Sequence, residues 1–135
     1  MDDFAVVINA GSSSLKFSVY RRPERDAWRL ETRGQIEGIG TSPHFSAKNG
    51  EGQPIADQTI TGSLTDGRAA LAYVADWLVE RHGGARVRGI GHRVVHGGAR
   101  YTGPTIVTPE VLDDLRKLIP LAPLHQPHNL AAIEA

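Results

Sequence analysis

The sequence predicts an α/β domain in which helices flank a mixed β-sheet. Two observations lead to this fold class. The first half of the chain contains strand-like segments joined by polar turns, and the second half alternates segments of helical periodicity with a further strand. With 135 residues, of which 40% are hydrophobic, the chain has the length of one ordinary domain with one core.

Residues 4–20 are predicted to form a β-hairpin. The run FAVVI is typical of a buried strand, and LKFSVY alternates apolar Leu15, Phe17 and Val19 with polar or amphipathic neighbours. Residues 21–62 mix charges, Gly and Pro with short apolar groups, which indicates further short antiparallel strands joined by surface loops.

A helix is predicted over residues 66–82. Its apolar side chains recur at helical spacing, and Gly83 and Gly84 supply the stop. The residues of this apolar stripe are Ala70, Leu71, Val74, Trp77 and Leu78.

The remaining segments continue the α/β pattern. Residues 85–98 read as a buried strand ending in a Gly-rich turn, and residues 108–119 as a helix with Thr108 as its N-cap and Pro109 at its first position. Asp113 and Asp114 are expected on the solvated side of that helix. The proline-rich PLAPLHQPHN then leads into LAAIEA, a helical pattern that stops without Gly or a basic last turn, so we expect the fold to be incomplete at its C-terminus.

Composition excludes several classes of function. Fifteen basic and fifteen acidic residues give a net charge of zero, and no stretch is basic enough to predict nucleic-acid or anionic-membrane binding. The absence of cysteine excludes disulfides, thiolate catalysis and cysteine-type zinc sites. The start MDDF followed by a short apolar run is neither a signal peptide nor a membrane span, so the sequence predicts a soluble cytosolic protein.

The turn NAGSSSLKF is the first candidate site. It lacks the second Gly of a P-loop, and Leu15 replaces the closing Gly of a nucleophile elbow. A strand-turn-strand remains, in which backbone amides and Ser hydroxyls can face a phosphate, with Lys16 on the face opposite Leu15 and Phe17. A plain hairpin tip is the alternative, since Asn, Gly and Ser are common turn formers.

The second candidate is Arg93 in GIGHRVVHGG, where a guanidinium interrupts an apolar strand pattern. A buried or cleft-facing Arg requires an anionic partner. That partner is either a carboxylate or phosphate ligand, bound by the bidentate fork, or an Asp or Glu of the core.

The third candidate is the proline-rich stretch, in which His125 can donate to developing negative charge or can hold the loop in shape. Together with His92, His96 and His128 it also offers spacings compatible with zinc. Histidines in Pro- and Gly-rich turns more often hydrogen-bond to the backbone or face a cleft, so we do not predict a zinc site.

NAGSSSLKF, GIGHRVVHGG and PLAPLHQPHNL, in this order and spacing, resemble the acetate kinase family, which includes acetate and propionate kinases. The resemblance covers all 135 residues. It implies a ribonuclease-H-like domain of the actin and sugar-kinase superfamily, whose first hairpin contacts nucleotide phosphates across a cleft. It also implies ATP and Mg²⁺ as cofactors, a homodimer, and reversible in-line transfer of the ATP γ-phosphoryl group to acetate, giving acetyl phosphate and ADP.

The resemblance assigns roles on the nucleotide side of the site. It implies that Asn9 belongs to the magnesium site, that Ser12 and Ser14 lie beside the phosphates, and that Lys16 is an ATP-site residue.

The resemblance also assigns roles on the acyl side of the site. It implies that Arg93 holds the acetate carboxylate, that Val95 and Leu124 surround the methyl group, and that His125 stabilises charge in the active site.

Members of the family are about three times longer, with a second, nucleotide-binding domain and a catalytic Asp expected beyond Ala135. Residues 1–135 are therefore expected to be the amino-terminal domain of the enzyme and to be inactive alone. Propionate or butyrate kinase activity and a non-catalytic anion-binding or interaction module on a kinase-like fold remain as alternatives.

Overall fold

The computed structural model describes residues 2–24, 27–62, 64–83, 86–95 and 97–134. Within them lies one six-stranded sheet with the order β5-β4-β3-β2-β1-β6. The strands are β1 (Asp3–Ala10), β2 (Ser14–Arg22), β3 (Arg29–Glu37), β4 (His44–Asn49), β5 (Pro54–Thr59) and β6 (Arg86–His92). The helices are α1 (Gly67–His82), α2 (Pro109–Arg116), the short 3-10 helix η1 (Ile119–Leu121) and α3 (Gln126–Glu134).

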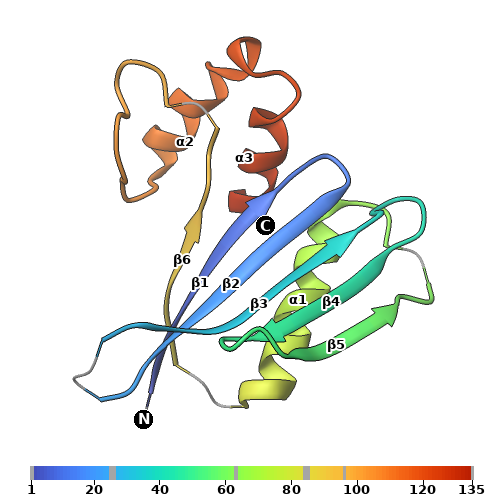
Figure 1. Ribbon diagram of the computed structural model, residues 1–135. Helices are drawn as coiled ribbons and strands as arrows, with labels where there is room; N and C mark the ends of the chain where they lie inside the picture. The colour runs from blue at the N-terminus through green and yellow to red at the C-terminus, as the bar shows by residue number, and fades with distance from the viewer. Residues whose placement is uncertain (1, 25–26, 63, 84–85, 96, 135) are drawn as a thin grey trace.

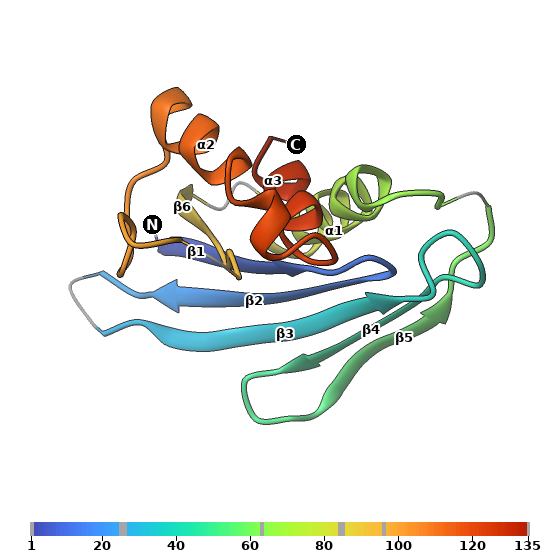
Figure 2. The same cartoon turned by 90° about the horizontal axis from the view of Figure 1, so that it is seen from above.

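The sheet is mixed, as the sequence predicts. Strands β1 to β5 form an antiparallel meander, and β6 pairs with β1 in parallel. Figures 1 and 2 show the helices on one side of the sheet, so that the opposite face of the strands is open. We call this the open face. No helix within the described residues is long and apolar enough to cross a membrane.

The hairpin of β1 and β2 follows the predicted alternation. Asn9 pairs with Lys16 and Ala10 with Leu15, and the turn is closed by a 2.9 Å hydrogen bond from the backbone N–H of Gly11 to the carbonyl of Ser14. Leu15 is fully buried toward the helices, whereas Lys16 is exposed on the open face. The prediction that these two side chains lie on opposite faces is confirmed.

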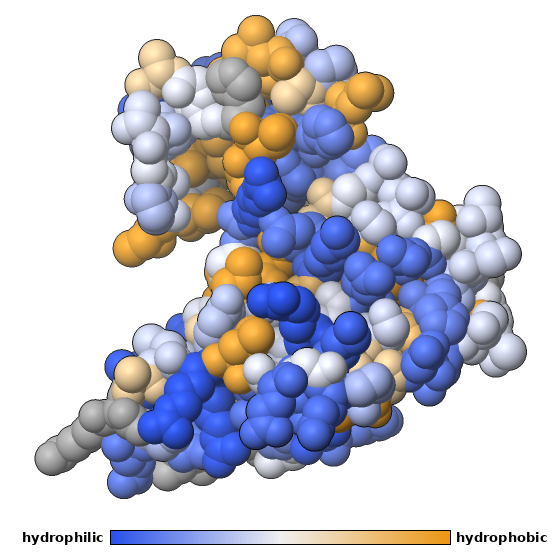
Figure 3. All heavy atoms as spheres, viewed as in Figure 1, coloured by the Kyte–Doolittle hydropathy of each residue, from blue (hydrophilic) through white to orange (hydrophobic). Residues whose placement is uncertain are grey.

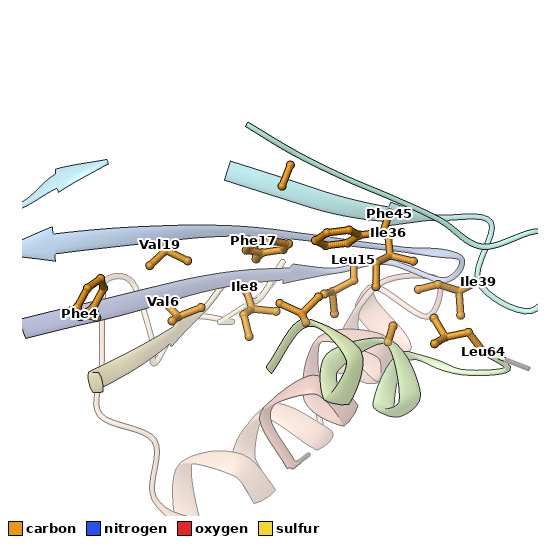
Figure 4. Packing of buried hydrophobic residues seen from close by; sticks show 13 residues of the cluster. Phe4, Val6, Ile8, Leu15, Phe17, Val19, Ile36, Ile39, Phe45 and Leu64 are labelled. Atoms are coloured by element: carbon orange, nitrogen blue, oxygen red, sulfur yellow. The ribbon is translucent and has the colours of Figure 1, made fainter. Parts of the chain in front are cut away.

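The core lies between the strands and α1, as Figure 4 shows for its buried side chains. The rings of Phe17 and Phe45 stack with centroids 6.1 Å apart, and Trp77 of α1 meets Phe45 edge-on at 5.1 Å. This packing requires a glycine at position 34, because a Cβ there would lie only 2.5 Å from the Phe17 ring. The aromatic cluster therefore fixes α1 against the centre of the sheet.

Helix α1 begins and ends as predicted. The side chain of Asp66 caps it by accepting a 2.9 Å hydrogen bond from the N–H of Ala69, and Gly83 follows the last turn. Gly84, the other predicted stop residue, lies outside the described residues.

Strand β6 differs from the prediction of a buried strand. It lies at the edge of the sheet beside β1, and the side chains of Val87 and Ile90 are 51% and 58% exposed. They line an open apolar cavity of about 470 Å³ between the sheet, α1 and α3. The apolar residues of β6 therefore form a strand, as predicted, but no described residue covers the side chains of Val87 and Ile90 where they face the cavity.

The segment after β6 contains a second difference. Asp114 is not on the solvated side of α2: its carboxylate accepts a 2.5 Å hydrogen bond from the hydroxyl of Tyr101 and lies 2.9 Å from Arg100. This hydrogen bond is the main cause that lowers the pKa of Asp114. The carboxylate therefore ties the loop before α2 to that helix.

Candidate functional site

The three candidate stretches meet at the carboxyl ends of β1 and β6. The backbone N–H of Arg93 donates to the carbonyl of Ile8 at 3.0 Å, which extends the parallel pairing by one residue. The N–H of Val95 donates to Oδ1 of Asn129, and Nδ2 of Asn129 donates to the carbonyl of Ala10, both at 2.9 Å. In open α/β sheets this end of parallel strands is the usual place for ligands.

The hairpin turn is held in one conformation by backbone hydrogen bonds. Besides the bond from Gly11 to Ser14, the carbonyl of Ser13 accepts from the N–H of Ile39 at 3.0 Å. The turn leaves Ser12 exposed and Ser14 half-buried. Its hydroxyls therefore stand at the surface of a rigid turn, where a phosphate could approach them.

Asn9 and Lys16 lie side by side across the hairpin. The Oδ1 atom of Asn9 is buried and has no hydrogen-bond partner within the described part of the chain. A buried acceptor without a donor is costly, and an amide oxygen is a ligand that Mg²⁺ accepts. This orphaned oxygen fits the magnesium-site role that the sequence resemblance implies.

Arg93 is exposed, so of the two predicted placements, buried or facing a cleft, the buried one does not hold. Only its backbone is fixed, through the hydrogen bond to Ile8. The side chain has no carboxylate partner among the described residues. The alternative of a core ion pair is therefore absent from that part of the structure, and the guanidinium can bind an external anion.

The other three residues assigned to the acyl side, Val95, Leu124 and His125, are exposed. Val95 is 46% exposed and Leu124 is 75% exposed. His125 is also exposed. Its backbone N–H donates to the carbonyl of Ala122 at 3.2 Å, and its carbonyl accepts from the N–H of Asn129 at 3.1 Å. The segments of Val95 and His125 are joined through Asn129, and all three side chains are open to solvent.

Two histidines that line the apolar cavity have lowered pKa values. His92 ends β6 opposite Ile8 and lines the apolar cavity, and burial lowers the pKa of its imidazole. Burial is also the main cause that lowers the pKa of His82, which lines the same cavity. Both imidazoles are therefore held neutral more firmly than free histidine.

Three of the four histidines considered for zinc, His92, His125 and His128, lie within the described residues. Residues 2–24, 27–62, 64–83, 86–95 and 97–134 contain no group of three or more His, Asp or Glu side chains that could hold a metal ion. His96, one of the four histidines considered, lies outside the described residues.

Asn129 is the residue that the sequence analysis missed. Its side chain is buried and uses both its donor and its acceptor to join the end of β1 to the segment after β6. The signal was present, because an Asn within an apolar helical pattern must find hydrogen-bond partners when it is buried. Asn129 therefore positions the strands whose ends carry Asn9 and Arg93.

The sequence profile of the Acetokinase family matches residues 4–135. The chain belongs to this family. It is 45% identical over 136 residues to an acetate kinase of Rhodopseudomonas palustris (strain TIE-1), with 100% of this chain and 34% of that protein covered. It is 39% identical over 138 residues to a propionate kinase of Escherichia coli O6:H1, with 100% and 32% covered.

Solved structures agree with this membership of the acetokinase family. The crystal structure of Porphyromonas gingivalis acetate kinase superposes with a TM-score of 0.82 at 26% identity, covering 98% of this chain and 33% of that one. A propionate kinase from Francisella tularensis gives 0.81 at 28% identity, with the same coverage. The chain thus has the fold of the amino-terminal part of these kinases, which confirms the predicted actin and sugar-kinase superfamily. It spans about a third of the length of these relatives.

Proposed function

We propose that this acetokinase-family chain is the amino-terminal domain of a cytoplasmic, homodimeric kinase that phosphorylates acetate. The reaction is reversible and forms acetyl phosphate and ADP from acetate and ATP. The observation that carries this proposal is the meeting of the hairpin turn, the Arg93 segment and the start of α3 at the carboxyl ends of two parallel strands.

On the nucleotide side, the hairpin turn holds phosphate groups. The hydroxyls of Ser12 and Ser14 donate to phosphate oxygens, and the exposed ammonium of Lys16 offsets their charge. The buried Oδ1 of Asn9 is the oxygen that would hold Mg²⁺. The metal supplies charge neutralisation on the phosphates when it is bound.

On the acyl side, Arg93 orients the acceptor. Its guanidinium binds the carboxylate of acetate through charge-assisted hydrogen bonds, while Val95 and Leu124 lie along the methyl group. One carboxylate oxygen then forms a bond to the γ-phosphorus in line with the bond to the bridging oxygen, which breaks as ADP leaves. His125 donates a hydrogen bond to the charge that develops during transfer.

The rest of the site belongs to residues outside this sequence. In this proposal a second domain supplies the adenosine contacts, a further cation and the catalytic Asp, so that the cleft closes over the γ-phosphoryl group. The 135-residue chain alone provides one wall of that cleft and does not turn over.

A second candidate is a preference for propionate. One of the relatives above is a propionate kinase that shares 39% identity over the whole of this chain. The exposed Val95 and Leu124 form only part of an acyl pocket and therefore fit either methyl or ethyl.

The test is an acyl-phosphate assay on the complete gene product that contains this sequence, with acetate, propionate and butyrate as acceptors. We expect the highest kcat/KM with acetate. A higher value with propionate would favour the second candidate, and no turnover with any of the three acids would contradict the proposed activity.

A further inference from the structure

The open face of the sheet carries a groove that begins beside the Asn9–Lys16 pair of the hairpin. It has a volume of about 380 Å³ and is lined by residues of β1 to β4, most of which are polar. Three of these side chains are cations, namely Lys16 of β2, Arg33 of β3 and Lys48 of β4. Figure 3, in the orientation of Figure 1, shows hydrophilic side chains gathered over the strands.

Strand register places these cations as near neighbours. Arg33 lies directly opposite Lys48 on one side and opposite Ser18 on the other. Lys16 lies in the adjacent row, opposite Gln35. Directly opposed side chains in an antiparallel pair stand about 5 Å apart at Cβ, and like charges there are destabilising.

Carboxylates do not compensate these charges. On the same strands Glu31 lies 3.9 Å from Arg21, and Glu37 accepts a hydrogen bond from Gln35 at 3.1 Å. Asp57 of β5 pairs with His44. Within the described residues no ion pair involves Lys16, Arg33 or Lys48.

Protection of a sheet edge does not explain the arrangement either. Lysines often guard exposed edge strands against pairing with other chains. Strands β3 and β4, however, are both paired on two sides, since the meander continues to β5. Two uncompensated cations opposed in the interior of a sheet therefore call for another source of negative charge.

We propose that this groove binds a phosphate group. The planar guanidinium of Arg33 takes two phosphate oxygens, and the ammonium groups of Lys48 and Lys16 flank the same anion. The hydroxyls of Ser18 and Ser46, which line the groove, are further donors. The groove shares Lys16 with the nucleotide side of the proposed function, but it does not require phosphoryl transfer, and its phosphate is either free or carried by a nucleotide.

Titrations of the 135-residue chain test the site. Inorganic phosphate and metal-free ATP are added in separate arms at constant ionic strength, and binding is followed by backbone amide NMR shifts. The variants are Arg33→Gln and Lys48→Gln. Lys117→Gln is the matched control, since it removes one positive charge from an exposed position on the other side of the sheet.

We expect each groove variant to bind about three- to tenfold more weakly, and the control to stay within about twofold. Without added anion, both groove variants melt about 1–4 °C higher than the parent chain, because the like-charge contact is relieved. A loss confined to the ATP arm supports the site with a nucleotide phosphate as its ligand, and a loss in the phosphate arm supports free phosphate.

Equal weakening by Lys117→Gln would overturn the proposal, because it would mean that net charge alone attracts the anion. Unchanged affinity of both groove variants in both arms would also overturn it. Neither result would bear on the proposed acetate kinase activity, which the acyl-phosphate assay tests separately.

Discussion

The side-chain amide of Asn129 donates a 2.9 Å hydrogen bond to the carbonyl of Ala10, which lies 119 positions earlier in the chain. The same side chain accepts from the N–H of Val95 at 2.9 Å. One amide thus satisfies two backbone groups, one at the end of β1 and one just after β6. Together with the hydrogen bond from the N–H of Arg93 to the carbonyl of Ile8, this side chain sets the distance between the hairpin and the Arg93 segment.

Replacing Asn129 with Ala is expected to lower the free energy of unfolding by about 1–3 kcal/mol, because two part-buried backbone groups lose their partner. Urea denaturation followed by circular dichroism measures the change. The control is Ala131→Ser, an exposed position on the same helix, which should stay within about 0.5 kcal/mol. If Asn129→Ala changed the free energy of unfolding as little as the control does, the two backbone groups would have found other partners.

Replacing Arg93 with Ala in the complete gene product is expected to raise KM for acetate about ten- to a hundredfold and to leave KM for ATP nearly unchanged. The loss corresponds to one charge-assisted contact of about 1.5–3 kcal/mol. Steady-state kinetics with each substrate varied in turn measures the effect. Equal damage to both substrates, or a change in melting temperature that shows misfolding, would remove Arg93 from the acyl site.

Stability should fall in mild acid because of His92 and His82. Burial lowers the pKa of both imidazoles below 6.5 in the folded chain, so the unfolded chain binds protons first as the pH falls. The free energy of unfolding is therefore highest above pH 6.5 and declines between that value and the lower folded pKa. Urea denaturation at several pH values measures the slope.

Substituting His92 with Gln should flatten part of this slope, and the remainder belongs to His82. His125→Gln, which removes an exposed imidazole, is the matched control. A slope that persists in full in His92→Gln would mean that this imidazole is not the group that titrates.

The 135-residue chain should bind Mg-ATP weakly and should not form acetyl phosphate. Lys16 and Arg93 are exposed, so each charge acts at high dielectric, where a contact contributes about 1 kcal/mol. Calorimetry should give a dissociation constant of about 1 mM that weakens with added salt. Turnover near that of ordinary kinases, about 1–100 s⁻¹, would contradict the expectation that a second domain is required.

The sequence predicted those elements whose signals are local. The alternation around Phe17 defines the β2 face that meets the core, and Asp66 caps the predicted helix α1. Lys16 and Leu15 lie on opposite faces of the sheet because successive side chains of a strand alternate between its two faces. Such signals depend on neighbouring residues and need no knowledge of the rest of the fold.

The sequence did not predict features that depend on distant neighbours. Apolar Val87 and Ile90 indicate a strand but not which of its sides is covered, and β6 is an edge strand. Asp114 is satisfied by Tyr101, thirteen positions away and across a loop. An Asn in an apolar helical pattern signals a need for hydrogen-bond partners, but that Ala10 is one of the partners of Asn129 follows only from the whole topology.

The parallel pairing of β6 with β1 sets the order in which this domain can be built during synthesis. Strands β1 to β5 pair with sequence neighbours, so they can assemble as they leave the ribosome. Strand β1, although paired on both sides in the finished sheet, keeps one edge unpaired until residues 86–92 have been made. We expect the nascent chain to be most prone to wrong pairing in that interval, and the end of the sheet that carries the candidate site to form last.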